Sequence, residues 1–170
     1  MAADRKIAVV GAGLMGHGIA LTMARAGHSV KITDPDSQAR ETVLDRIAGS
    51  LGLLGPGDAA ISDIQDRIEV CASTDETVSA ASFVFEAAPE SLELKRQVFA
   101  EIERHSSETC ILASNTSVMP ITQIMKNLRV QDLTPKASKN ARRCSRLPTM
   151  TRHPSARMFS LPRLNWPDAI

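Results

Sequence analysis

The feature that most constrains the fold is a glycine-rich turn that directly follows a short apolar segment. KIAVV, at residues 6–10, is the continuous apolar run typical of a strand buried on both faces of a sheet. GAGLMG follows at residues 11–16, and apolar side chains then recur at every fourth position until Gly27, which is placed to end a helix. A strand, a tight glycine turn and a helix in this order predict the first unit of an α/β sheet.

The chain up to residue 128 continues to alternate in this way. We expect further strands at residues 29–34, 67–71, 82–88 and 110–114, helices from Asp36 or Ser37 to Leu54, from Asp75, at 91–105 and at 120–128, a turn at Gly55–Asp58, and Pro120 at the favoured first helical position. Because the expected strands are apolar throughout, the sheet should be parallel and covered by helices on both faces. The predicted fold class is α/β, with a doubly wound parallel sheet.

The positions of three glycines indicate that the turn binds a phosphorylated ligand. Gly11 permits the tight turn, Gly13 lets the backbone approach a pyrophosphate, and Gly16 allows close packing of the helix against the strand. The backbone N–H groups at Leu14 and Met15, at the positive end of the helix dipole, would then receive the phosphates. The alternative is a βα turn that binds nothing.

Asp34 extends this pattern to a dinucleotide site of the Rossmann type. It ends the second expected strand, 23 positions after Gly11, where a carboxylate can accept hydrogen bonds from the adenosine ribose hydroxyls. Its charge would repel a 2′-phosphate, and no arginine stands beside it, so NAD is favoured over NADP. FAD binds through the same kind of turn, and Asp34 by itself could simply cap a turn.

Two later segments carry a family resemblance. FVFEAAPESLELKRQVFAEI, at residues 83–102, and ILASNTSVMPITQI, at residues 111–124, contain an E-A-x-P-E and an S-N-T-S motif. With the glycine turn, they resemble the NAD-binding domain of L-3-hydroxyacyl-CoA dehydrogenases over about residues 5–128. The resemblance implies NAD-dependent oxidation of L-3-hydroxyacyl-CoA to 3-oxoacyl-CoA, as in fatty-acid and butanoate metabolism. Relatives that oxidise carnitine or gulonate share the pattern.

Matching these motifs to the family assigns roles to four residues. The resemblance implies that Glu90 and Lys95 contact the nicotinamide half of NAD, that Ser117 contacts both cofactor and substrate oxygen, and that Asn115 lies in the same wall. Glu90 and Ser117 each follow the end of an expected parallel strand, where open α/β sheets bind ligands. Taken alone, Glu90 could begin a helix, Lys95 could be a solvated helix lysine, and Asn115 and Ser117 could form a polar turn.

The chain changes in composition after residue 128. Residues 1–128 hold 11 Lys/Arg against 17 Asp/Glu, whereas residues 129–170 hold 9 against 2 and five of the nine prolines. We therefore predict a Rossmann domain at residues 1–128 and an irregular basic tail at residues 129–170. A nucleic-acid-binding arm is the alternative. The tail, however, contains only one Trp, one Phe and no Tyr on which bases could stack.

The tail also departs from the family's pattern. The resemblance calls for a general-base histidine about twenty residues after Ser117, in an H-F-[FW]-N-P motif, with a glutamate partner; residues 134–141 contain no histidine, and His153 has no matching surroundings. The abrupt change resembles a truncation or a shifted reading frame. We therefore expect weak or no turnover and an open sheet edge. An acyl-CoA substrate and a homodimer are implied only for the full-length family.

Cysteine usage and hydropathy bear on location. The three cysteines have no metal-ligand spacing, and Cys71 and Cys110 lie in apolar runs where a buried, inert thiol is expected. This cysteine usage leads us to expect a reducing cytoplasm and no metal. We also expect no membrane segment, because the first 26 residues contain glycines that interrupt the apolar run.

Overall fold

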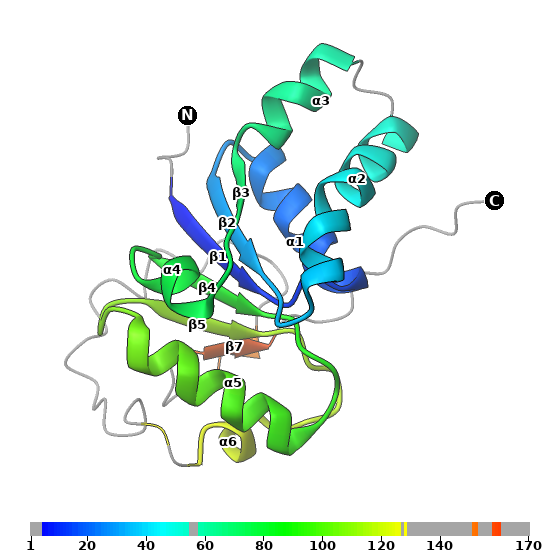
Figure 1. Ribbon diagram of the computed structural model, residues 1–170. Helices are drawn as coiled ribbons and strands as arrows, with labels where there is room; N and C mark the ends of the chain where they lie inside the picture. The colour runs from blue at the N-terminus through cyan, green and yellow to red at the C-terminus, as the bar shows by residue number, and fades with distance from the viewer. Residues whose placement is uncertain (1–4, 55–57, 127, 129–150, 153–157, 161–170) are drawn as a thin grey trace.

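The structure is a computed structural model that describes residues 5–54, 58–126, 128, 151–152 and 158–160. Strands and helices alternate along it (Figure 1). The elements are β1 Lys6–Val10, α1 Leu14–Arg25, β2 Ser29–Thr33, α2 Ser37–Leu54, α3 Asp58–Gln65, β3 Ile68–Val70, α4 Thr74–Val78, β4 Phe83–Glu86, α5 Leu92–His105, β5 Ile111–Ser114, α6 Ile121–Ile124, β6 Thr151–Arg152 and β7 Met158–Ser160.

The sheet has the strand order β3-β2-β1-β4-β5-β7-β6. β1 to β5 pair in parallel, and their order 3-2-1-4-5 is that of a doubly wound Rossmann sheet. The chain leaves β1 toward β2 on one side and returns to β4 on the other. The carboxyl ends of β1 and β4 therefore flank the switch point where such sheets bind ligands.

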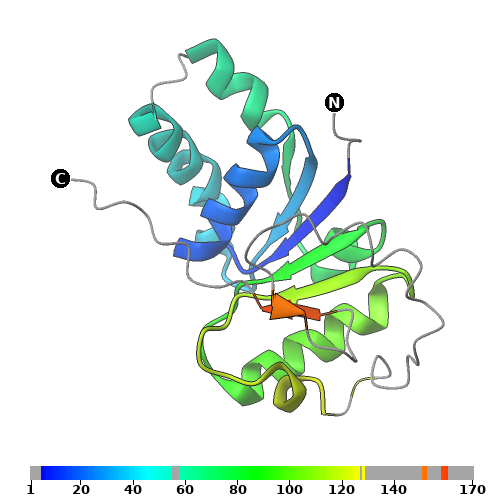
Figure 2. The same ribbon diagram turned by 180° about the vertical axis from the view of Figure 1, so that it is seen from behind.

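Alternate residues of β1 pack on opposite faces of the sheet. Ile7 and Val9 join one core cluster, which contains residues of α1 and α2, and Ala8 and Val10 join another, which contains residues of α4, α5 and α6. Figures 1 and 2 show α1, α2 and α3 on one face of the sheet and α4, α5 and α6 on the other. This two-sided burial explains why the strands are mostly apolar, and it confirms the predicted fold class.

Two local predictions were wrong. Residues 58–65 form a helix, α3, where we expected only a turn before the next strand. The proline and glycines at residues 55–57, which lie outside the described residues, indicated a turn, and a helix of only two turns leaves little periodicity by which to recognise it. Ile61 and Ile64 of α3 pack against the first core cluster. Pro120 is the N-cap of α6 rather than its first helical residue.

Part of the tail belongs to the sheet. β7 pairs in parallel with β5 and antiparallel with β6, so two short strands of the tail, which we expected to be irregular, extend the sheet beyond β5. The physical reason is that the free edge of β5 offers backbone donors and acceptors, and pairing with it requires no side-chain period. The rest of residues 129–170 lies outside the described residues. The boundary at residue 128 and the nucleic-acid arm stay predictions.

Cys71 and Cys110 are free and buried, as expected from their apolar surroundings. Burial raises the pKa of the Cys110 thiol to about 11, and burial is also the main cause that raises the pKa of Cys71. At neutral pH both groups are therefore protonated, which makes them poor nucleophiles.

Candidate dinucleotide-binding site

The glycine turn at the end of β1 needs glycine at two of its positions. Gly11 has φ of +108°, and a Cβ there would lie 2.7 Å from the carbonyl oxygen of Ala87. A Cβ at Gly16 would lie 1.7 Å from the carbonyl oxygen of Gly11. At Gly13, by contrast, a Cβ would meet no described atom within 4 Å, so the turn is open on that side. A ligand can approach the backbone there.

The start of α1 faces this opening. Gly13 is the N-cap, and within the described part of the chain no side chain caps the helix and no acidic residue lies in its first turn. Leu14 and Met15, the first helical residues, have 81% and 48% of their surface exposed. The helix start therefore keeps its positive dipole end accessible, as an anionic pyrophosphate requires.

Asp34 lies just past the end of β2, and its carboxylate is held in place by the backbone. Oδ2 accepts a hydrogen bond from the N–H of Ala12 at 2.7 Å, and Oδ1 accepts one from the N–H of Asp36 at 3.0 Å. Each carboxylate oxygen retains acceptor capacity beyond one hydrogen bond. Asp34 therefore ties the glycine turn to β2 and can still accept from ribose hydroxyls. These residues fit a dinucleotide.

An arginine lies beside Asp34, which corrects the expectation from the sequence. Arg40, the fourth residue of α2, donates from Nη1 to the carbonyl oxygens of Asp34 at 2.6 Å and of Pro35 at 3.2 Å. The contact could not be seen in the sequence, because Arg40 is six residues from Asp34 and the chain changes from strand to helix between them. Arg40 binds the backbone here rather than the carboxylate, so the negative charge of Asp34 is not paired with it.

Backbone hydrogen bonds join the ends of four neighbouring strands into one edge. The N–H of Gly11 donates to Thr33 at 2.8 Å, that of Ala87 donates to Val10 at 2.8 Å, and that of Asn115 donates to Glu86 at 2.8 Å. The glycine turn, Asp34, the loop after β4 and the loop after β5 therefore lie side by side. The sequence motifs converge at one place although they span more than 100 residues.

A buried ion pair lies beneath the loop after β4. Glu86, the last residue of β4, and Lys95 on α5 have no exposed side-chain surface, and Lys95 Nζ lies 2.8 Å from Glu86 Oε1. Oε1 also accepts from the N–H of Ala88 at 2.7 Å, and Oε2 accepts from Ser114 Oγ at 2.5 Å. Lys95 donates in addition to the carbonyl oxygen of Ala88 at 3.0 Å. Such complete hydrogen bonding is what a buried charge pair needs.

Glu90 lies above this pair, partly exposed at the edge of the sheet. Its Oε2 is 3.3 Å from Lys95 Nζ, and its Oε1 accepts hydrogen bonds from Thr116 Oγ1 at 2.5 Å and from the N–H of Ser117 at 3.3 Å. Burial alone would raise the pKa of Glu90, but the Thr116 hydrogen bond and the Lys95 charge outweigh it and lower the pKa below 4.5. Glu90 is therefore a carboxylate at neutral pH.

The structure brings most of the predicted residues of the second half together. Glu90 contacts both Lys95 and Ser117, and Asn115 follows β5 in the adjoining loop. Lys95 is buried, so the alternative of a solvated helix lysine was wrong. The sequence reasoning missed Glu86 and Thr116. A charged residue that ends an otherwise apolar strand, as in FVFE, was the available signal for Glu86.

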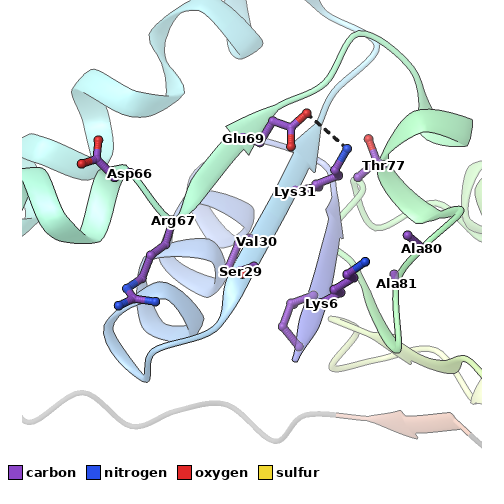
Figure 3. A pocket seen from close by; sticks show the side chains of 11 residues that line it. Lys6, Ser29, Val30, Lys31, Asp66, Arg67, Glu69, Thr77, Ala80 and Ala81 are labelled. Atoms are coloured by element: carbon purple, nitrogen blue, oxygen red, sulfur yellow. Dashed lines mark hydrogen bonds and ion pairs between the residues drawn. The ribbon is translucent and has the colours of Figure 1, made fainter. Parts of the chain in front are cut away.

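A separate hollow of about 440 Å³ lies away from this edge. It is bounded by residues of β1, β2, β3, α4 and the loops beside β3 and α4, including Lys6, Lys31 and Arg67 (Figure 3). Lys31 is paired with Glu69 at 3.2 Å. Glu69 also lies with Cys71 and Glu76 in a group whose ligand atoms are within 4.8 Å of one another. Because the Lys31 ammonium already balances Glu69, we assign no metal to this group.

Replacement of Thr116 by valine should shift the acid sensitivity of the domain. A carboxyl whose pKa is lowered on folding contributes stability above its unfolded pKa, and this contribution is lost as pH falls through the folded pKa. Thr116→Val removes one cause of the lowering at Glu90, so the stability lost on acidification should be smaller and the loss should be complete at a higher pH. Urea midpoints measured between about pH 6 and pH 3 would detect the shift. Thr116→Ser, which keeps the hydroxyl, should behave like the unaltered chain.

The strand order, the open glycine turn and the carboxylate after β2 together define a dinucleotide-binding Rossmann domain. Comparison with known proteins agrees. The family model described as "3-hydroxyacyl-CoA dehydrogenase, NAD binding domain" matches residues 6–134. The chain belongs to this family, and its dinucleotide is NAD.

Individual relatives show what share of a family member's length this chain covers. It is 34% identical over 132 residues to a probable 3-hydroxyacyl-CoA dehydrogenase of Caenorhabditis elegans, covering 72% of this chain and 43% of the relative. It is 34% identical over 120 residues to an L-carnitine dehydrogenase of Streptomyces griseus, covering 71% and 36%. The crystal structure of (S)-3-hydroxybutyryl-CoA dehydrogenase from Ralstonia eutropha matches with a TM-score of 0.69 at 33% identity, covering 73% and 45%. The chain thus spans less than half the length of these relatives.

Proposed function

We propose that this chain is the cofactor-binding part of an NAD-dependent dehydrogenase that oxidises L-3-hydroxyacyl-CoA to 3-oxoacyl-CoA. The observation that carries the proposal is the cluster of Glu90, Thr116 and Ser117 on the same edge as the glycine turn. NAD supplies the hydride acceptor for this reaction. The pyrophosphate would bind at the start of α1, the ribose at Asp34, and the nicotinamide half beside Glu90.

Ser117 would orient the substrate in this arrangement. Its side chain is exposed beside Glu90, where a hydroxyl can donate to the oxygen of a bound 3-hydroxy or 3-oxo group. Oxidation also needs a base that removes the hydroxyl proton. Among the described residues no histidine contacts this cluster: His17 hydrogen-bonds Gly13 and Ser50, His28 accepts from the N–H of Arg5, and His105 pairs with Asp75 and Glu101. We therefore expect weak turnover from the chain alone.

The proposal extends to partners and location. Acyl-CoA is the expected substrate, because relatives named as 3-hydroxyacyl-CoA and 3-hydroxybutyryl-CoA dehydrogenases share the NAD-binding domain. A homodimer is expected only of the full-length family, and a cytoplasmic location is a further expectation for this chain, supported by two free thiols. No helix within the described residues is long and apolar enough to cross a membrane.

A related 3-hydroxy acid is the second candidate substrate. The L-carnitine dehydrogenase of Streptomyces griseus is as similar in identity as the hydroxyacyl-CoA relative. Carnitine has a free carboxylate where 3-hydroxybutyryl-CoA has its thioester, and it carries a quaternary ammonium on C4, so the two substrates differ in charge and size. Parallel assays with 3-hydroxybutyryl-CoA and with L-carnitine, each with NAD, would separate them through the initial rate of NADH formation.

Cofactor binding can be tested first. We expect saturable enhancement of NADH fluorescence on addition of the chain, and binding of NADPH at least about tenfold weaker, since ~1.4 kcal/mol of repulsion between a 2′-phosphate and Asp34 gives that ratio. Asp34→Asn should reduce the difference between the two cofactors. A chain that does not bind NADH, or binds both equally well, would contradict this site.

A further inference from the structure

Glu86 is a fully buried acidic residue at this edge, and the NAD site as derived above does not use it. Its side chain has no exposed surface, and three groups donate to its two oxygens: Lys95 Nζ and the N–H of Ala88 to Oε1, and Ser114 Oγ to Oε2. The three donors come from α5, from the loop after β4 and from β5. Glu86 therefore joins the elements from which the nicotinamide end of the site is built.

Lys95 divides its interactions between two carboxylates at different distances. Its ammonium lies 2.8 Å from Glu86 and 3.3 Å from Glu90, and it donates to the carbonyl oxygen of Ala88 at 3.0 Å. Glu86 and Ala88 therefore fix the position of the ammonium. Glu90, at the longer distance and with 36% of its side chain exposed, keeps acceptor capacity toward the open edge.

We propose that Glu86 is a positioning residue for the nicotinamide half of the cofactor, which it controls by holding Lys95 below Glu90. The inference rests on the proposed function, because it assumes that Glu90 faces the bound cofactor. Without the charge of Glu86, the buried ammonium would have Glu90 as its single carboxylate partner among the described residues. The attraction would then draw Glu90 inward, away from the edge, and the nicotinamide end would lose its acceptor.

Binding of two ligands tests this role against a purely structural one. NADH carries the nicotinamide half and ADP-ribose lacks it, while both contain the parts that would bind at the glycine turn and Asp34. For Glu86→Gln we expect NADH to bind about tenfold more weakly, as for loss of a hydrogen bond that involves a charged group, and ADP-ribose to bind within about twofold of the unaltered chain. Glu69→Gln, which breaks the exposed Lys31–Glu69 pair, is the matched control and should change neither affinity.

Two variants keep the inference open to refutation. If Glu86→Gln does not fold, Ser114→Ala removes a single donor to Glu86 and should weaken NADH binding in the same selective way but to a smaller extent. Equal weakening of both ligands, or unchanged NADH affinity in a folded Glu86→Gln chain, would overturn the positioning role alone. Failure of the unaltered chain to bind either ligand would overturn the NAD site itself, and this inference with it.

Discussion

Gly16→Ala is expected to prevent the domain from folding. The added Cβ would lie 1.7 Å from the carbonyl oxygen of Gly11 and 2.8 Å from its carbonyl carbon. Both atoms belong to the backbone of the turn, so no side-chain rotation can relieve the overlap. Helix α1 would have to move away from β1, although its Ala20, Leu21 and Ala24 are buried in the core. The loss should exceed about 4 kcal/mol, which approaches the whole stability of many domains.

Gly18→Ala is the matched control for this prediction. Gly18 lies in the same helix, two residues further on, but a Cβ there would meet none of the described atoms within 4 Å. Because alanine is the better helix former, the substitution should leave stability unchanged or raise it by up to about 1 kcal/mol. Urea unfolding followed by circular dichroism would measure both variants. Similar effects of the two substitutions would contradict the close packing of β1 and α1.

The glycine turn could be predicted from the sequence because its function depends on local backbone geometry. Gly11, Gly13 and Gly16 follow a strand and open a helix within six residues, and both the positive φ of Gly11 and the contact of Gly16 with Gly11 are local constraints. Asp34 could be placed for the same reason, since its position at the end of β2 follows from the strand boundary. Contacts between residues that are close along the chain can therefore be recognised as a local sequence motif.

Other features depend on which strands become neighbours. Lys95 has the pattern of an ordinary helix lysine, and its burial depends on the packing of α5 against β4, which brings it to Glu86. The pairing of β4 with β5 in turn sets Ser114 opposite Glu86. β7 likewise depends on the free edge of β5. Neither arrangement leaves a local pattern, because the partners are separated by 9 to 46 residues along the chain.

Lys95→Met should destabilise the domain by about 3–5 kcal/mol, because it leaves the Glu86 carboxylate buried without its cation. Methionine replaces the aliphatic part of lysine, so little packing volume changes. The hydrogen bonds from Ala88 and Ser114 remain. They do not compensate for the negative charge of the Glu86 carboxylate, which is fully buried. Lys31→Met removes the cation of an exposed pair instead, and it should change stability by no more than about 1 kcal/mol.

The double variant Glu86→Gln/Lys95→Met distinguishes loss of the charge balance from loss of packing. If the cost of Lys95→Met arises from the uncompensated charge of Glu86, neutralising Glu86 should restore most of the stability, giving a coupling energy of about 2 kcal/mol or more in a double-mutant cycle. If it arises from packing, the two losses should add. The same double variant lacks the ammonium below Glu90, so restored folding should not restore the NADH affinity expected of the unaltered chain. Stability and nicotinamide binding would then respond separately. Stability would recover because no unpaired charge remains buried, whereas NADH binding would stay weak because Glu90 has lost the ammonium of Lys95.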